Sequence, residues 1–155
     1  MNWFKFVIAI IICQLAGVVG SIFTSKSVNT WYTTLQKPSL TPPGNVIGIV
    51  WIVLFVLMGI SLYVVWDKFP KNKKSKSALF TFGVQLVLNI LWSVFFFGMK
   101  SPFLALINIG LLWLFILLTI LSFYKISKIS AYLLVPYIVW VSFASYLNFS
   151  IWRLN

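Results

Sequence analysis

Long apolar runs separated by short polar connectors dominate the chain. Five runs contain no charged residue, and they cover residues 6–23, 46–66, 78–97, 103–123 and 131–152. A helix needs roughly 20 apolar residues to cross the hydrocarbon core of a bilayer, about 30 Å thick. Backbone polar groups in lipid must be satisfied internally, and the alternating strands typical of a β-barrel are absent. The pattern predicts an all-α integral membrane protein, a five-transmembrane-helix bundle in a single membrane domain over residues 1–155.

Composition supports lipid as the main solvent. Hydrophobic residues make up 61% of the chain and charged residues only 8%. A water-soluble domain of this length cannot bury so much apolar surface. The length of the first run favours a membrane span over a cleaved signal sequence.

The net charge of +11 raises the question of nucleic-acid binding. The charges lie between the apolar runs, which is typical of loops that flank a membrane and contact anionic lipid headgroups. We therefore expect membrane lipid as a partner and no nucleic acid.

The distribution of charge predicts an orientation. Eight cationic side chains lie on the amino-terminal side of the predicted bundle, at Lys5, in residues 67–77 and in residues 124–130, against four on the other side. The positive-inside rule then predicts a cytoplasmic N-terminus. Eleven lysines against one arginine hint at a bacterial genome of low GC content, and hence at the bacterial plasma membrane.

The chain lacks the residues that metal sites, disulfides and acid–base catalysis commonly require. The chain has no His and no Glu, its one acidic residue is Asp67, and its one cysteine is Cys13. Zinc or iron sites of the usual composition, an intrachain disulfide and acid–base catalysis by His or paired carboxylates are thereby excluded. We expect no metal site and no required cofactor.

The connector WYTTLQKPSLTPPG, residues 31–44, is unusually stiff and aromatic. Pro38, Pro42 and Pro43 each fix φ and restrain the residue before them, so a structured loop is expected here. Two interpretations stay open on composition alone. The loop either folds over the mouth of the bundle as a lid, or anchors Trp31 and Tyr32 among lipid headgroups.

Polar and aromatic residues recur at helical spacing inside three runs. Single faces carry Trp51, Phe55 and Met58 in one run, Gln85, Asn89, Trp92 and Phe96 in another, and Trp140, Ala144, Leu147 and Asn148 in the last. Amides in lipid are costly unless paired, so Gln85, Asn89 and Asn148 should face the interior. These residues either pack the helices together or line an apolar pocket with a few orienting polar groups.

Three motifs carry a resemblance to a known family. They are WYTTLQKPSLTPPG with the following GIVW, then QLVLNILWSVFFFG at 85–98, and PYIVWVSFASYLN at 136–148. In this order and at this spacing, the chain resembles the TspO/MBR family of tryptophan-rich sensory proteins, which includes the translocator protein, or peripheral benzodiazepine receptor. The resemblance extends over essentially the whole chain.

The resemblance implies a membrane receptor or sensor for porphyrins such as protoporphyrin IX and for synthetic hydrophobic ligands. The ligand-binding positions that it implies, together with those from spacing, are Trp31, Tyr32, Pro42, Trp51, Phe55, Gln85, Asn89, Trp92, Phe96, Trp140, Ala144 and Leu147. One alternative is a light- and oxygen-dependent enzyme that degrades porphyrin, in which Trp51 and Trp140 are catalytic. A second alternative is a tetrapyrrole transporter.

Two further patterns concern helix packing. Pro136 should kink the last span because it lacks a backbone donor. Ala9, Cys13, Gly17 and Ser21 recur every four residues and would permit close helix contact, either within the chain or in a homodimer.

Overall fold

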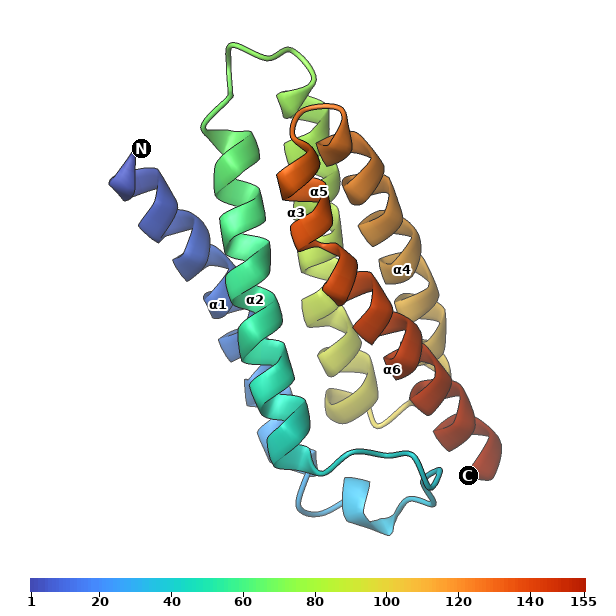
Figure 1. Cartoon of the computed structure of the whole chain (residues 1–155). Coiled ribbons are helices and arrows are strands. Elements are labelled where there is room, and N and C mark those ends of the chain that lie inside the picture. Colours follow the sequence, from blue (N-terminus) through green and yellow to red (C-terminus); the bar gives the residue numbers. More distant parts are fainter.

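The computed structural model describes all 155 residues as a bundle of helices without strands (Figure 1). Five helices are long and apolar enough to cross a membrane. They are α1 (Trp3–Ser27), α2 (Gly44–Trp66), α3 (Ser75–Ser93) continued by the π-helical turn η2 (Val94–Gly98), α4 (Pro102–Tyr124), and the pair α5 (Lys128–Leu133) and α6 (Val135–Leu154). The predicted five-helix membrane bundle with a structured first loop is therefore confirmed.

The helices extend a few residues beyond the uncharged runs because polar side chains cap their first turns. The side chains of Asn2, Ser101 and Ser127 each accept a hydrogen bond from the backbone amide three residues later. Helix α2 begins at Gly44, two residues before the run at Val46, with Pro43 as the extended residue before it. Capping thus sets the first residues of α1, α4 and α5, whereas hydropathy only locates the spans.

Helices α1 and α2 pack closely at Gly59. A Cβ atom at this position would lie 2.8 Å from the Cα of Ile10, so only glycine permits the observed approach. Ala9 and Cys13 on the same side of α1 are fully buried. The α1 face of small residues is thus used for packing within the chain.

The four-residue stripe predicted on α1 is only partly correct. Ser21 is exposed and donates to the carbonyl of Val18, while Ala16 and Gly20 take the buried positions. A step of four residues drifts by roughly 40° around a helix of 3.6 residues per turn. The buried face therefore passes from positions 9 and 13 to positions 16 and 20.

The last span is interrupted before Pro136. Helix α5 ends at Leu133, Leu134 separates the helices, and α6 has the proline in its first turn. Pro136 cannot donate to a carbonyl one turn earlier, so the predicted distortion takes the form of a break. Figure 1 shows α6 leaving α5 at a changed direction and running to the C-terminal end of the chain.

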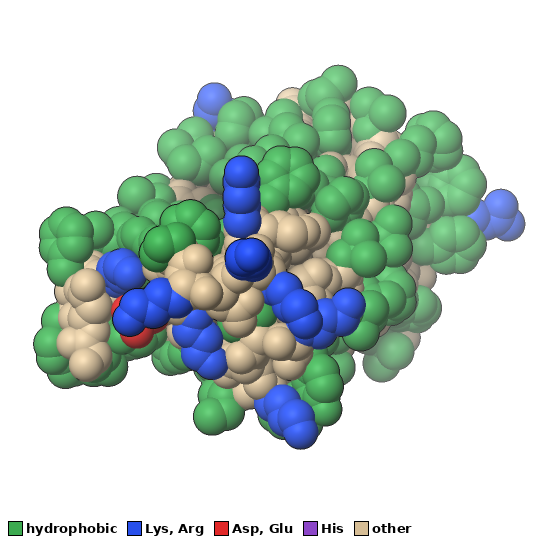
Figure 2. Space-filling view, turned by 90° about the horizontal axis from the view of Figure 1, so that it is seen from above, with side chains coloured by type: hydrophobic (Ala, Val, Ile, Leu, Met, Phe, Trp, Pro, Cys, Tyr) green, Lys and Arg blue, Asp and Glu red, His purple; other side chains and the backbone are tan.

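The two ends of the bundle differ in charge. The N-terminus, the loop between α2 and α3 and the turn between α4 and α5 lie at one end, while the loop between α1 and α2 lies at the other (Figure 1). Figure 2 looks onto the first end and shows its lysines gathered beside exposed hydrophobic side chains, with one acidic group among them. The charge asymmetry expected from the sequence is thus a property of the fold.

Candidate functional site

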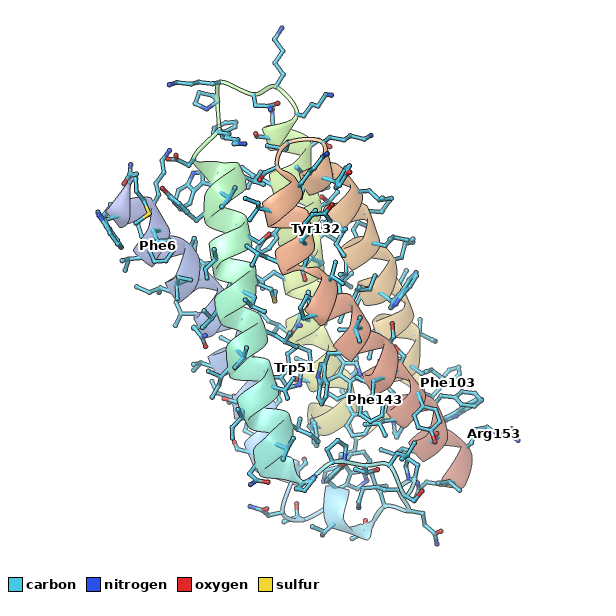
Figure 3. All side chains as sticks on the ribbon, in the orientation of Figure 1. Phe6, Trp51, Phe103, Tyr132, Phe143 and Arg153 are labelled. Carbon is cyan, nitrogen blue, oxygen red and sulfur yellow. The ribbon has the colours of Figure 1, made fainter.

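Aromatic rings fill the interval between α2 and α6 near the middle of the bundle. Trp51 stacks on Phe55 with 5.6 Å between ring centroids, and meets Tyr137 of α6 edge to face at 6.3 Å. Phe55 also covers Gly17, where an added Cβ would lie 2.8 Å from its ring. In Figure 3 Trp51 points from α2 toward α6. These rings join α1, α2 and α6 through flat apolar surfaces.

A hydrogen-bonded network lies beside these rings. The Tyr137 hydroxyl accepts from Asn89 Nδ2 and donates to Gln85 Oε1, both at 2.8 Å. All three residues are buried. The network joins α3 to α6 and satisfies most of the polar atoms that these side chains bring into the bundle.

Two N–H groups at this level have no acceptor in the protein. They are Gln85 Nε2 and Trp140 Nε1, and both atoms are buried. The Tyr137 hydroxyl, Asn89 Nδ2 and Gln85 Oε1 beside them are paired, so these two groups stand out. An unpaired buried donor is costly, and a ligand with an acceptor atom would remove that cost.

A second aromatic cluster lies one turn further along α3. Trp92 stacks on Phe96 with 4.9 Å between centroids, and its indole Nε1 donates to Asn148 Oδ1 at 2.9 Å. Phe96 and Phe97 are both buried although they are consecutive in sequence. The π-helical turn η2 contains both residues and alters the helical register there, as π-turns often do near functional sites.

The loop between α1 and α2 covers this second cluster. It contains the short 3₁₀ helix η1 (Tyr32–Thr34). The ring of Trp31 lies 5.6 Å from that of Phe96, and the ring of Tyr32 lies 5.6 Å from that of Phe97. Both loop aromatics are half-buried. Of the two interpretations of this loop, the structure supports the lid.

Polar contacts hold the loop in this closed position. Lys37 Nζ donates to the carbonyls of Tyr32 and Leu35 and lies 4.6 Å from the Tyr32 ring centroid. Burial raises the pKa of the Tyr32 phenol. At the other side of the loop, the backbone of Gln36 and the side chain of Asn155 exchange two hydrogen bonds, of 3.0 and 2.9 Å. The loop is thus fastened to its own lysine and to the end of α6.

The structure brings most of the predicted site residues into two adjoining groups. The groups are Trp51, Phe55, Gln85, Asn89 and Trp140 with Ala144 packed nearby, and Trp31, Tyr32, Trp92 and Phe96. Pro42 and Leu147 are half-buried and belong to neither hydrophobic cluster.

Sequence reasoning missed two residues of these groups, Tyr137 and Phe97, and one contact, that of Asn148. Tyr137 lies three residues before Trp140, and this spacing could have placed it on the same face of the helix. Asn148 was expected in the interior but not as the acceptor of the Trp92 indole. Phe97 had no signal in the sequence, because a regular helix would direct it away from Phe96.

Comparison with known proteins gives a consistent result over the whole bundle. The profile of the TspO/MBR family matches residues 9–153. The tryptophan-rich protein TspO of Chlorobaculum tepidum is 48% identical over 144 residues, which are 93% of this chain and 91% of that protein. The translocator protein of Homo sapiens is 37% identical over 92% of this chain and 85% of its own length. The tryptophan-rich sensory protein of Cereibacter sphaeroides is 32% identical over 100% of this chain and 94% of its own length.

Proposed function

The chain belongs to the TspO/MBR family, and from that premise we propose that it is a membrane receptor that binds porphyrins in the aromatic site between α2, α3 and α6. The name of the Cereibacter sphaeroides relative describes a sensory protein. A receptor for a flat apolar molecule fits both that name and the side chains of the site.

The observation that carries the proposal is the pair of unpartnered buried donors, Gln85 Nε2 and Trp140 Nε1. A porphyrin bears carboxylate groups, and these accept hydrogen bonds from N–H groups. Bound there, a carboxylate would satisfy donors that are otherwise buried without an acceptor. This chemistry gives the site a reason to prefer an acidic tetrapyrrole over an apolar molecule of similar size.

The surrounding rings supply the apolar part of the binding energy. Trp51 and Phe55 on α2 present stacked faces beside Tyr137. Aromatic pairs add about 0.5–1.5 kcal/mol to the effect of burial, and a porphyrin offers a large flat surface to such rings. The loop residues Trp31 and Tyr32 would shield the ligand from water at the adjoining end of the site.

The proposal is tested by titrating the purified full chain in detergent with protoporphyrin IX in the dark. We expect saturable quenching of Trp fluorescence. Trp140→Phe retains a ring but removes the donor and should weaken binding about tenfold, the factor that roughly 1.4 kcal/mol produces. Trp3→Phe is the matched control, because Trp3 is 65% exposed near the N-terminus, and it should bind as the wild type does.

Two results would overturn the receptor proposal. Quenching that never saturates, or that is equal in all three proteins, would show partition of porphyrin into the micelle. Illumination of the bound sample tests the alternative of an enzyme. Conversion of the porphyrin to a defined product that protein-free samples do not form, and that Trp51→Phe and Trp140→Phe abolish, would replace binding by degradation as the function.

We further propose that the chain lies in a bacterial plasma membrane with its N-terminus in the cytoplasm. Eight of the twelve cationic residues lie at the end of the bundle that carries the N-terminus, in support of this orientation. Ser39→Cys in the loop between α1 and α2 and Ser77→Cys at the start of α3 each place a single accessible thiol, at opposite ends of the bundle. An impermeant maleimide should label only the first in intact cells, and labelling of only the second would reverse the orientation.

A further inference from the structure

An apolar groove opens between α1, α2 and α3 in the half of the bundle that bears the lysines. Its volume is about 260 Å³, and its lining includes Ile12, Leu62, Trp66, Leu79, Gly83 and Leu86. This volume is below the roughly 300–1,000 Å³ of pockets that enclose compact ligands. None of the lining residues belongs to the aromatic site, so the groove is a separate feature of the molecule.

Gly83 is the reason that the α3 wall of the groove is recessed. It is exposed, and a Cβ at this position would meet no atom within 4 Å. Glycine destabilises the interior of a helix relative to alanine, and no close helix contact at this position requires it. The missing side chain leaves space beside Leu79 and Leu86, on a face that a membrane protein presents to lipid.

Cationic side chains lie at the end of the groove nearest the lysine-rich surface. Lys5 is seven residues before Ile12 on α1, and Lys76 is seven residues before Gly83 on α3. Seven residues are two helical turns, about 10.5 Å, so each lysine shares a helix face with the groove residue below it. Lys5 Nζ lies 5.9 Å from the ring centroid of Trp66, which also lines the groove.

The one acidic group of the chain lies at this rim as well. Asp67 Oδ1 forms an ion pair with Lys5 Nζ at a distance of 3.8 Å, and both side chains are partly exposed. Lys76 is exposed and has no acidic partner in the protein. Further lysines at positions 68, 71, 73 and 74 belong to the same end of the bundle. The rim therefore carries a clear excess of positive charge (Figure 2).

We propose that this groove binds one acyl chain of an anionic phospholipid, whose phosphate is held by Lys76 and Lys5. Charge at the rim and apolar side chains below it reproduce the order of a phospholipid, from headgroup to chain. Phosphate near a lysine-rich surface gains about 1 kcal/mol per lysine. The site selects lipids by headgroup charge and holds them in one position against α1 and α3.

The test is native mass spectrometry of the purified full chain with phosphatidylglycerol and phosphatidylcholine of identical acyl chains. We expect the first bound lipid to be phosphatidylglycerol. Gly83→Leu fills the groove and should abolish retention of that lipid. Gly110→Leu on α4 is the matched control, since its Cβ also meets no atom within 4 Å, and it should retain the lipid.

A second pair of variants tests recognition of the lipid headgroup and leaves the apolar lining of the groove unchanged. Lys76→Gln should lower the preference for phosphatidylglycerol about fivefold, the factor that about 1 kcal/mol produces. Lys128→Gln removes an exposed cation at the same end but on α5, and should leave the preference unchanged. Equal binding of both lipids by the wild type, retention by Gly83→Leu, or equal losses in the two lysine variants would each overturn the proposal. Displacement of phosphatidylglycerol by an equal concentration of free fatty acid would overturn it too, by identifying a different occupant.

Discussion

Trp92 donates its indole N–H to the side-chain oxygen of Asn148 across 2.9 Å, which joins α3 to α6 next to the covered aromatic cluster. Asn148 Nδ2 in turn donates to the carbonyl of Pro102 in the first turn of α4. One amide thus connects three helices in a region where water is scarce. The bond with Pro102 orients the Asn148 amide, and the bond with the indole fixes the position of the Trp92 ring, on which Phe96 stacks.

Asn148→Ala should therefore lower thermal stability in detergent. The substitution leaves the Trp92 N–H and the Pro102 carbonyl without partners, at a cost of about 1–3 kcal/mol. At about 2–4 °C for each kcal/mol in a chain of this length, this loss lowers the melting temperature by roughly 2–12 °C. Asn45→Ala removes an exposed amide from α2 and should leave the melting temperature within about 1 °C. Equal melting curves for the two variants would contradict the structural role of Asn148.

Tyr137→Phe tests the network that surrounds the two unpartnered donors. The ring and its contact with Trp51 remain, but Asn89 Nδ2 loses its acceptor and Gln85 Oε1 loses its donor. We expect a loss of about 1–3 kcal/mol, measured as a lower melting temperature. Tyr146→Phe is the control, because Tyr146 is 45% exposed and its hydroxyl makes no hydrogen bond in the protein. An unchanged melting temperature for Tyr137→Phe would mean that water replaces the hydroxyl.

Much of this fold could be predicted because bilayer thickness sets helix length and lipid excludes charge. The five spans, the interior position of Gln85 and Asn89, and the distortion before Pro136 all follow from local sequence. The sequence-based helix ends were short by a few residues, since capping by Asn2 or Ser127 extends a helix beyond its apolar run.

The rest depends on contacts between residues far apart in the chain. The bonds between Gln36 and Asn155 join positions 119 residues apart, and no local pattern predicts them. The burial of Phe97 depends on the π-helical turn, which periodicity at 3.6 residues does not reveal. Likewise, only the packed helices show that Gly17 lies beneath Phe55.

Asn155→Ala should loosen the lid without unfolding the bundle. The variant loses both hydrogen bonds to the backbone of Gln36, so we expect that amide to exchange its hydrogen about tenfold faster. Gln36→Ala is a strict control, because the two hydrogen bonds to Asn155 use only the backbone of Gln36. Hydrogen exchange followed by mass spectrometry checks both variants. Rapid exchange in Gln36→Ala, or protection in Asn155→Ala, would show that other contacts hold the loop.

The lid should also respond to alkaline pH through Tyr32. Burial raises the pKa of its phenol above the ordinary value of about 10. The neutral phenol is therefore the form that the closed loop favours, and its contribution to closure is complete below pH 10. Closure weakens as the pH rises through the raised pKa, because the phenolate favours the open loop. The difference in absorbance at 295 nm between wild type and Tyr32→Phe should titrate above pH 10, and a midpoint at or below 10 would contradict burial of this ring.

Gly59→Ala examines the close contact between α1 and α2. The new methyl group would lie 2.8 Å from Ile10 Cα and 3.2 Å from the Ala9 carbonyl oxygen, so α1 must move away from α2. Backbone atoms cannot yield as a flexible side chain can, and such overpacking typically costs about 1–3 kcal/mol. Gly48→Ala in the same helix meets no atom within 4 Å, and its better helix propensity should keep or raise the melting temperature. Thermal unfolding of both variants therefore separates the effect of contact from that of propensity. If both raise the melting temperature equally, α1 does not approach α2 as closely as the structure shows.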